Sequence, residues 1–278
     1  MTTAELLSFL GLAWSRLLVF PGGACVLIAV WLAEAFERRR AQPALLFFPT
    51  SWLTSPLTAS AVVLPWLGVA LLPLPGATAL SRPVDLVAVV GLLEWPRLLA
   101  ITADLQRGDR TRGVQRLAAA LNGYPPLVLS LLLMSLKTGT LEVAGLLRVP
   151  EIGAPLQHTA WFWLGAGALI LALPPLIEVG PFALDTLDEL RPGLRLRTLG
   201  FILIAALPGM ALLTRDDAED WWRIALPPLA LGGALWVFHS STRQQSALRW
   251  ARIYAGLDLI LLLALLAAGL LALQARLA

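Results

Sequence analysis

Long apolar segments alternate with short polar ones along almost the whole chain. A hydrocarbon core about 30 Å thick requires roughly 20 apolar residues per transmembrane helix, and segments near that length recur with no polar domain between them. The pattern therefore predicts about eight transmembrane helices in a single transmembrane domain, residues 1–278. Their expected bounds are 6–36, 56–74, 84–105, 117–136, 161–177, 198–213, 221–238 and 253–273.

Composition supports the same class. Of 278 residues, 58% are hydrophobic and 14% charged, with a mean hydropathy of +0.76, which is more apolar surface than a soluble core can bury. The fold class we predict is an all-α polytopic membrane protein. Cys25 is the single cysteine, so an intrachain disulfide is excluded. Glu5 stands where a signal peptide would carry basic residues, so we expect no cleaved leader.

The basic residues predict the orientation of the helices. Arginines concentrate in the gaps after the first, third, fifth and seventh predicted helices, and short loops rich in Lys and Arg stay in the cytoplasm. Both termini are then expected on the outer, periplasmic face of the inner (cytoplasmic) membrane. This distribution also explains the net charge of +3 without a nucleic-acid partner. The arginines concerned are Arg38, Arg39, Arg40, Arg107, Arg110, Arg112, Arg116, Arg191, Arg195, Arg197, Arg243, Arg249 and Arg252.

A few ionisable residues lie within or near the predicted spans, where a charge is costly and usually faces protein, water or a partner charge. Glu94 and Arg97 are three residues apart on one helix, close enough to pair. They form either a neutralised structural pair or a proton-relay carboxylate with its controlling arginine. Asp258 has no partner on its own helix, so it is either functional or paired with another helix. The full set is Arg16, Glu34, Glu94, Arg97, Asp104 and Asp258.

The polar interval from Glu178 to Arg197 separates two long apolar spans. It holds four carboxylates followed by three arginines, and polar chemistry or a partner subunit is expected there because its surroundings are almost entirely apolar. Arginine suits such an interface, since its planar guanidinium stays charged and can grip carboxylates in two places. The charged residues are Glu178, Asp185, Asp188, Glu189, Arg191, Arg195 and Arg197.

Three segments carry a family resemblance through their order along the chain: Glu37-Arg38-Arg39, residues 113–124, and the stretch from Glu178 to Glu189. Together they resemble the membrane subunit of respiratory complex I (NADH-quinone oxidoreductase) that forms the quinone-access channel, here called the quinone-channel subunit. The first, Glu37-Arg38-Arg39, is similar to that family's Glu-Arg-Lys/Arg triplet after the first helix. Residues 113–124 resemble its Gly-x-Leu-Arg-x-Ala-Ala-Gln-x-x-Ser-Tyr segment. Glu178, Pro181-Phe182-Ala183-Leu184 and Asp188-Glu189 resemble its loop after the fifth helix. Energy-converting hydrogenases and formate hydrogenlyase use a related protein.

The resemblance implies a membrane-arm subunit of a complex I-like or membrane-hydrogenase-like assembly, with no cofactor of its own. Expected partners are iron-sulfur or hydrogenase-like subunits on the cytoplasmic face and antiporter-like subunits in the membrane, with a quinone at the interface in some assemblies. The proton-relay candidates in this chain are Glu94, Arg97, Tyr124 and Asp258. Implied docking or quinone-cavity residues are Glu37, Arg38, Arg39, Glu178, Asp185, Asp188, Glu189, Arg191, Arg195 and Arg197.

Departures from the family pattern favour docking over proton conduction in the loop after the fifth helix. Ala183 and Thr186 stand where the family has acids. Two alternatives stay open. One is a secondary transporter with its site at Glu94, Arg97 and Asp258, and the other is a purely structural membrane anchor in a larger assembly.

Overall fold

A computed structural model describes residues 30, 55–72, 85–142, 145–146, 149–150, 156–184, 189–213 and 221–277. Within these ranges the regular structure is helical, and every predicted helix except the first is present. Apart from Val30, the first predicted helix lies outside the described residues, as does the Glu37-Arg38-Arg39 triplet. The helices are α3 (Pro56–Ala70), α4 (Leu86–Gln106), α5 (Arg110–Thr138), α6 (Leu156–Leu176), α7 (Arg191–Leu213), α8 (Trp221–Thr242) and α9 (Ala247–Leu277), with a short 3-10 turn, η3 (Gly180–Phe182), after α6.

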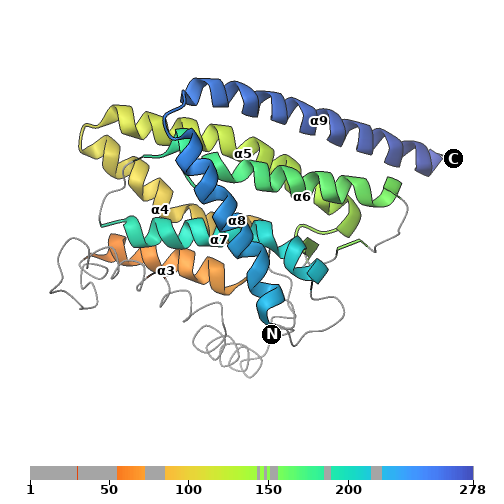
Figure 1. Cartoon of the computed structure of the whole chain (residues 1–278), viewed down its shortest axis with the longest axis horizontal. Coiled ribbons are helices and arrows are strands. Elements are labelled where there is room, and N and C mark those ends of the chain that lie inside the picture. The colour runs from red at the N-terminus through yellow and green to blue at the C-terminus, as the bar shows by residue number, and fades with distance from the viewer. Residues whose placement is uncertain are drawn as a thin grey trace.

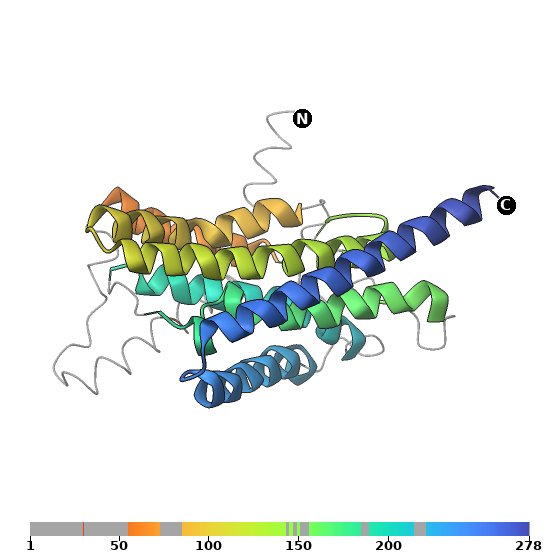
Figure 2. The same cartoon turned by 90° about the horizontal axis from the view of Figure 1, so that it is seen from above.

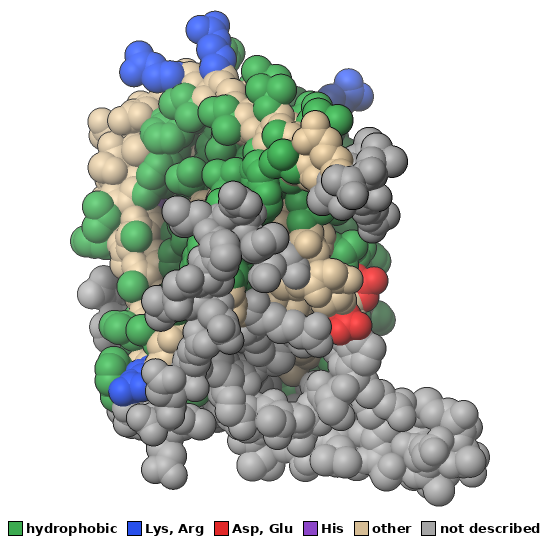
Figure 3. Space-filling view, turned by 90° about the vertical axis from the view of Figure 1, so that its right-hand side faces the viewer, with side chains coloured by type: hydrophobic (Ala, Val, Ile, Leu, Met, Phe, Trp, Pro, Cys, Tyr) green, Lys and Arg blue, Asp and Glu red, His purple; other side chains and the backbone are tan. Residues whose placement is uncertain are grey.

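Six of these helices, α4 to α9, are long and apolar enough to cross a membrane, and α3 is a shorter apolar helix of 15 residues. Hydrophobic side chains spread over the described part of the face in Figure 3, and charged side chains are few and lie towards its margins. Such a surface is suited to lipid rather than water. The chain is therefore a multi-pass α-helical membrane protein.

The helices form a bundle in which α5 and α6 lie side by side and α9 runs along them (Figures 1 and 2). On the other side of this pair, α7 packs against α3, α4 and α8. The α4–α5 turn, the turn containing η3 and the α8–α9 turn lie towards the same end of the bundle (Figure 1). We call this the η3 end. Three of the loops that the arginine pattern predicts to be cytoplasmic lie there, and the loop after the first predicted helix is outside the described residues.

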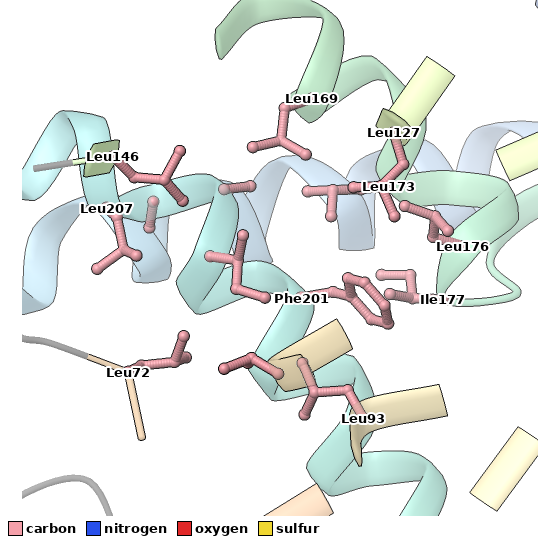
Figure 4. Close-up of a cluster of buried hydrophobic side chains, with 14 of the residues drawn as sticks. Leu72, Leu93, Leu127, Leu146, Leu169, Leu173, Leu176, Ile177, Phe201 and Leu207 are labelled. Carbon is pink, nitrogen blue, oxygen red and sulfur yellow. The ribbon is translucent and has the colours of Figure 1, made fainter. Parts of the chain in front are cut away.

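One large apolar core joins α4, α5, α6 and α7. Leu93 from α4, Leu173 from α6 and Phe201 from α7 are at most 1% exposed and belong to the same cluster (Figure 4). A smaller cluster places Phe182 of η3 against Tyr254 of α9. The core therefore fixes α4, α6 and α7 around the position where the polar residues of the bundle lie.

Proline explains how the end of α6 is tied to α9. Pro175 has no backbone N–H, so the carbonyl of Leu171, four residues earlier, loses its helical hydrogen-bond donor. The Tyr254 hydroxyl donates to that carbonyl at 2.8 Å. An unpaired carbonyl in lipid costs several kcal/mol, so this contact from a neighbouring helix makes Pro175 tolerable inside α6.

Four helices begin more than one turn earlier than the hydropathy pattern predicts. α6 begins at Leu156 rather than 161 and α9 at Ala247 rather than 253, and the shift is largest in α5 and α7. α5 begins at Arg110 rather than 117, and α7 begins at Arg191 rather than 198. These last two bounds were wrong because arginines were assigned to loops. Arg116 and Arg197 instead lie inside these helices and are almost completely buried, since carboxylates from other helices accompany them.

Glycine at position 193 allows α7 to approach α3 closely. A Cβ there would lie 2.1 Å from the carbonyl oxygen of Ala61, which is backbone and cannot move aside. We expect Gly193→Ala to destabilise the protein by about 1–3 kcal/mol through overpacking. Thermal unfolding of the purified protein in detergent measures this. Gly91→Ala is the control, because a Cβ at Gly91 meets nothing within 4 Å; equal loss in both variants would contradict the close approach.

Candidate functional site: a buried chain of charges

Six charged side chains lie inside the apolar bundle. The three arginines are at most 1% exposed at their side chains and the three carboxylates at most 7%. Four helices and the turn after α6 enclose the group. The residues are Glu94, Arg97 and Asp104 from α4, Arg116 from α5, Glu178 from the turn and Arg197 from α7.

Glu94 lies between two arginines. Its Oε1 accepts a hydrogen bond from Arg197 Nη2 at 2.8 Å, and its Oε2 lies 3.9 Å from Arg97 Nη1. The contact with Arg97 is the i,i+3 pair expected from the sequence. The shorter contact, with Arg197, joins α4 to α7 across 103 positions of sequence.

Glu178 lies between two arginines in the same way. Its Oε1 is 3.0 Å from Arg97 Nε, and its Oε2 accepts from Arg116 Nη1 at 2.5 Å. Arg116 Nε also donates to Asp104 Oδ2 at 2.8 Å. The charges therefore alternate along one continuous chain, in the order Arg197, Glu94, Arg97, Glu178, Arg116 and Asp104. We call this the charge chain.

The charge chain extends from near the η3 end of the bundle into its interior. Asp104 is close to the end of α4 and Glu94 is ten residues earlier, near the middle of that helix. At 1.5 Å per residue, the two carboxylates are separated by roughly 15 Å along the helix axis. The ion pairs of the charge chain therefore connect the η3 end electrostatically with the middle of the bundle.

The end of α6 provides further acceptors for the arginines. The last carbonyls of a helix have no partners within it and carry partial negative charge. Arg97 Nη2 donates to the Pro175 carbonyl at 3.3 Å, Arg97 Nη1 to the Leu176 carbonyl at 3.4 Å, and Arg197 Nη2 also donates to Leu176. The helix end and the carboxylates together surround the two guanidinium groups.

The backbone at Glu178 adopts a left-handed conformation, with φ at 57°. This is the conformation that usually calls for glycine after a helix end, and the Val179 N–H closes the turn on the Pro174 carbonyl at 3.0 Å. A non-glycine residue is disfavoured there. The ion pairs of Glu178 with Arg97 and Arg116 offset that cost, so the turn and the charge chain support each other.

Two aromatic rings also contact the arginines. The Arg97 guanidinium carbon lies 5.8 Å from the centre of the Tyr124 ring, and that of Arg197 lies 5.2 Å from the Phe201 ring. A guanidinium near an aromatic ring face gains electrostatic stabilisation, which is larger away from water. Tyr124, a predicted relay residue, is therefore adjacent to the charge chain.

The charge chain holds three positive and three negative groups and is neutral as a whole. Among its buried atoms, Glu94 Oε2 and Arg197 Nε have no hydrogen-bond partner within the described residues. Glu94 Oε2 consequently keeps the capacity to accept a hydrogen bond. In chemical terms the charge chain is a set of alternating ion pairs, in which a change of charge at one member alters the contacts of its neighbours. No group of three or more His, Cys, Asp or Glu residues suited to a metal ion is present in the described ranges.

The other predicted site residues lie elsewhere. Glu189 is exposed and lies 3.8 Å from Arg107, while Arg191 and Arg195 are half-buried in the first turns of α7. Asp258 on α9 has a buried Oδ1 with no hydrogen-bond partner in the described chain and does not take part in the charge chain. The residues outside the described ranges are Glu37, Arg38, Arg39, Asp185 and Asp188.

Two members of the charge chain, Asp104 and Arg116, were not among the predicted site residues. Asp104 had a usable signal, since it is an acid near the end of a predicted span. Arg116 had a weaker signal, since it matches the arginine of the Gly-x-Leu-Arg segment, but three other arginines precede it in a pattern typical of a cytoplasmic loop.

Comparisons with protein-family models, with curated proteins and with solved structures found no match to this chain.

The buried pair of Arg116 and Asp104 can be compared with an exposed pair on the same helix. Arg116→Met leaves a buried carboxylate without its arginine, so we expect a loss of about 3–5 kcal/mol in the free energy of unfolding. Arg112 pairs with Asp109 at 3.1 Å, but both side chains are more than 40% exposed, and Arg112→Met should cost at most about 1 kcal/mol.

Unfolding titrations in mixed detergent micelles measure both variants. Adding Asp104→Asn to Arg116→Met should recover part of the loss, since it removes the uncompensated charge. If Arg112→Met and Arg116→Met lower the free energy of unfolding by the same small amount, the buried pair contributes no more to stability than the exposed one.

Proposed function

We propose that this chain is a membrane-arm subunit of a redox-driven, ion-translocating complex of the complex I or membrane-hydrogenase type, in the inner (cytoplasmic) membrane. The observation that carries the proposal is the charge chain, which is neutral as a whole and links the η3 end to the bundle interior. The order of sequence segments that resemble the quinone-channel subunit of complex I supports it independently.

The charge chain offers a physical route for coupling. Each inner member contacts two opposite charges, so neutralising one carboxylate frees its arginines to strengthen their contacts with the next. In an apolar interior such a rearrangement is favourable only if every remaining charge keeps a partner. A change of charge at Glu178 is then passed through Arg97, which contacts both carboxylates, to Glu94.

The η3 end supplies the proposed contact with a cytoplasmic redox arm. Arg110, Arg243, Arg249 and Arg252 are exposed there, and Glu189 and Arg107 form an exposed pair. An arm whose surface carries carboxylates would be attracted to such a face and oriented by it. Under this proposal the chain holds no cofactor alone, and a quinone, where present, is shared with the arm.

The transporter alternative receives less support. Its site would require Asp258 beside Glu94 and Arg97, but Asp258 is on α9, which packs on α5 and α6, whereas Glu94 and Arg97 pair with α7 and with the turn after α6. The remaining alternative, a structural anchor, assigns the charge chain to stability alone. The following experiments separate these functions.

Purification of the tagged chain from native membranes in mild detergent tests the assembly. We expect iron-sulfur subunits, or hydrogenase-like ones, and antiporter-like membrane subunits to copurify in fixed proportion, identified by mass spectrometry. Recovery of a lone chain that moves a substrate across vesicle membranes by itself would instead support the transporter.

Glu178→Gln in the assembled complex tests coupling. The amide keeps the size of the side chain but removes the charge between Arg97 and Arg116. We expect electron transfer to continue while the ion gradient formed per electron falls severalfold, measured with a pH-sensitive dye in inverted vesicles. Glu142→Gln is the control, because Glu142 lies outside the charge chain. If the Glu178→Gln complex assembles and translocates ions as before, the charge chain has no role in coupling, and the anchor function is supported instead.

A further inference from the structure

A pocket opens between α5, α9 and the segment that follows α6. Its volume is about 440 Å³, and its wall is mostly alanine, proline, leucine and phenylalanine side chains. Gln115 and Asn122 on α5 provide polar groups, and the Asn122 amide donates to the Ala118 carbonyl at 2.8 Å. Pockets of this size and lining hold largely apolar ligands oriented by a few polar contacts.

The pocket lies at the level of the membrane interface. Trp250, one residue from Ala251 of the wall, packs edge to face on Phe238 and donates its indole N–H to Gln245 at 2.9 Å. Tryptophan with an apolar ring contact and a polar partner is typical of the interfacial belt of a membrane protein. The first turns of α9 are therefore at headgroup depth, and the pocket extends from there towards the hydrocarbon.

An exposed arginine borders the apolar wall on α9. Arg252 follows Ala251 and lies four residues after Leu248, so it is on the pocket side of the helix, whereas Arg249 is on a different face. Both side chains are exposed, and neither takes part in an ion pair with the described residues. An apolar cavity beside an exposed guanidinium at headgroup depth matches a ligand with an acyl chain and an anionic head.

We propose that this pocket binds an anionic phospholipid, with one acyl chain against Ala118, Phe182 and Leu248 and the phosphate group held by Arg252. A guanidinium grips phosphate oxygens through two parallel hydrogen bonds. Basic residues beside pockets between transmembrane helices at the cytoplasmic side recognise anionic headgroups in this way. The inference does not depend on the proposed redox function.

Native mass spectrometry of the purified full-length chain, titrated with phosphatidylglycerol or phosphatidylcholine of matched acyl chains, tests the site. We expect phosphatidylglycerol to bind the more tightly, and Arg252→Gln to weaken its binding about fivefold. Arg249→Gln is the matched control and should change the affinity little. Ala118→Phe fills the pocket from an exposed position and should abolish the preference, whereas Ala267→Phe, exposed on α9 outside the pocket, should not.

Several results would overturn the proposal. Equal affinity for the two lipids would remove the role of the charge, and equal effects of Arg252→Gln and Arg249→Gln would indicate nonspecific attraction. Displacement of phosphatidylglycerol by an uncharged quinone analogue at lower concentration would assign the pocket to that class of ligand. Arg252→Gln and Ala118→Phe test the site separately. If gel filtration shows that one of them misfolds, the other still decides the outcome.

Discussion

Each charge inside this apolar bundle requires an opposite charge in contact with it. An isolated guanidinium or carboxylate removed from water costs several kcal/mol even after relaxation. Arg97 and Arg197 lie in the interior only because Glu94, Glu178 and the carbonyls at the end of α6 surround them. The requirement determines how α4, α5, α6 and α7 are placed, since each contributes groups that the others need.

The same requirement explains local features that otherwise look unfavourable. The left-handed backbone at Glu178 and Pro175 before it lie where the chain leaves α6, and both are compensated by contacts from other helices. The apolar core around Leu93 and Phe201 holds α4, α6 and α7 together beside the charge chain. Stability and candidate function therefore depend on the same part of the molecule.

Hydropathy was sufficient to predict the helices, because a membrane imposes length and composition on each span. Seven of the expected helices are present in the described chain. The contact between Glu94 and Arg97 was also predictable, since residues three apart share a helix face. The longer-range pairs were not. The sequence places Arg197 and Glu178 in a polar interval between two predicted spans. Only the packing of distant helices shows that both side chains lie inside the bundle.

A double-mutant cycle between the two ends of the charge chain tests the central claim that its six residues act as one network. The free energy of unfolding is measured for Asp104→Asn, Arg197→Met and the double variant. If the charge chain is one network, the change in the free energy of unfolding of the double variant should differ from the sum of the two single changes by more than about 0.5 kcal/mol. This is expected although Asp104 and Arg197 share no ion pair. Additivity within that limit would contradict the account.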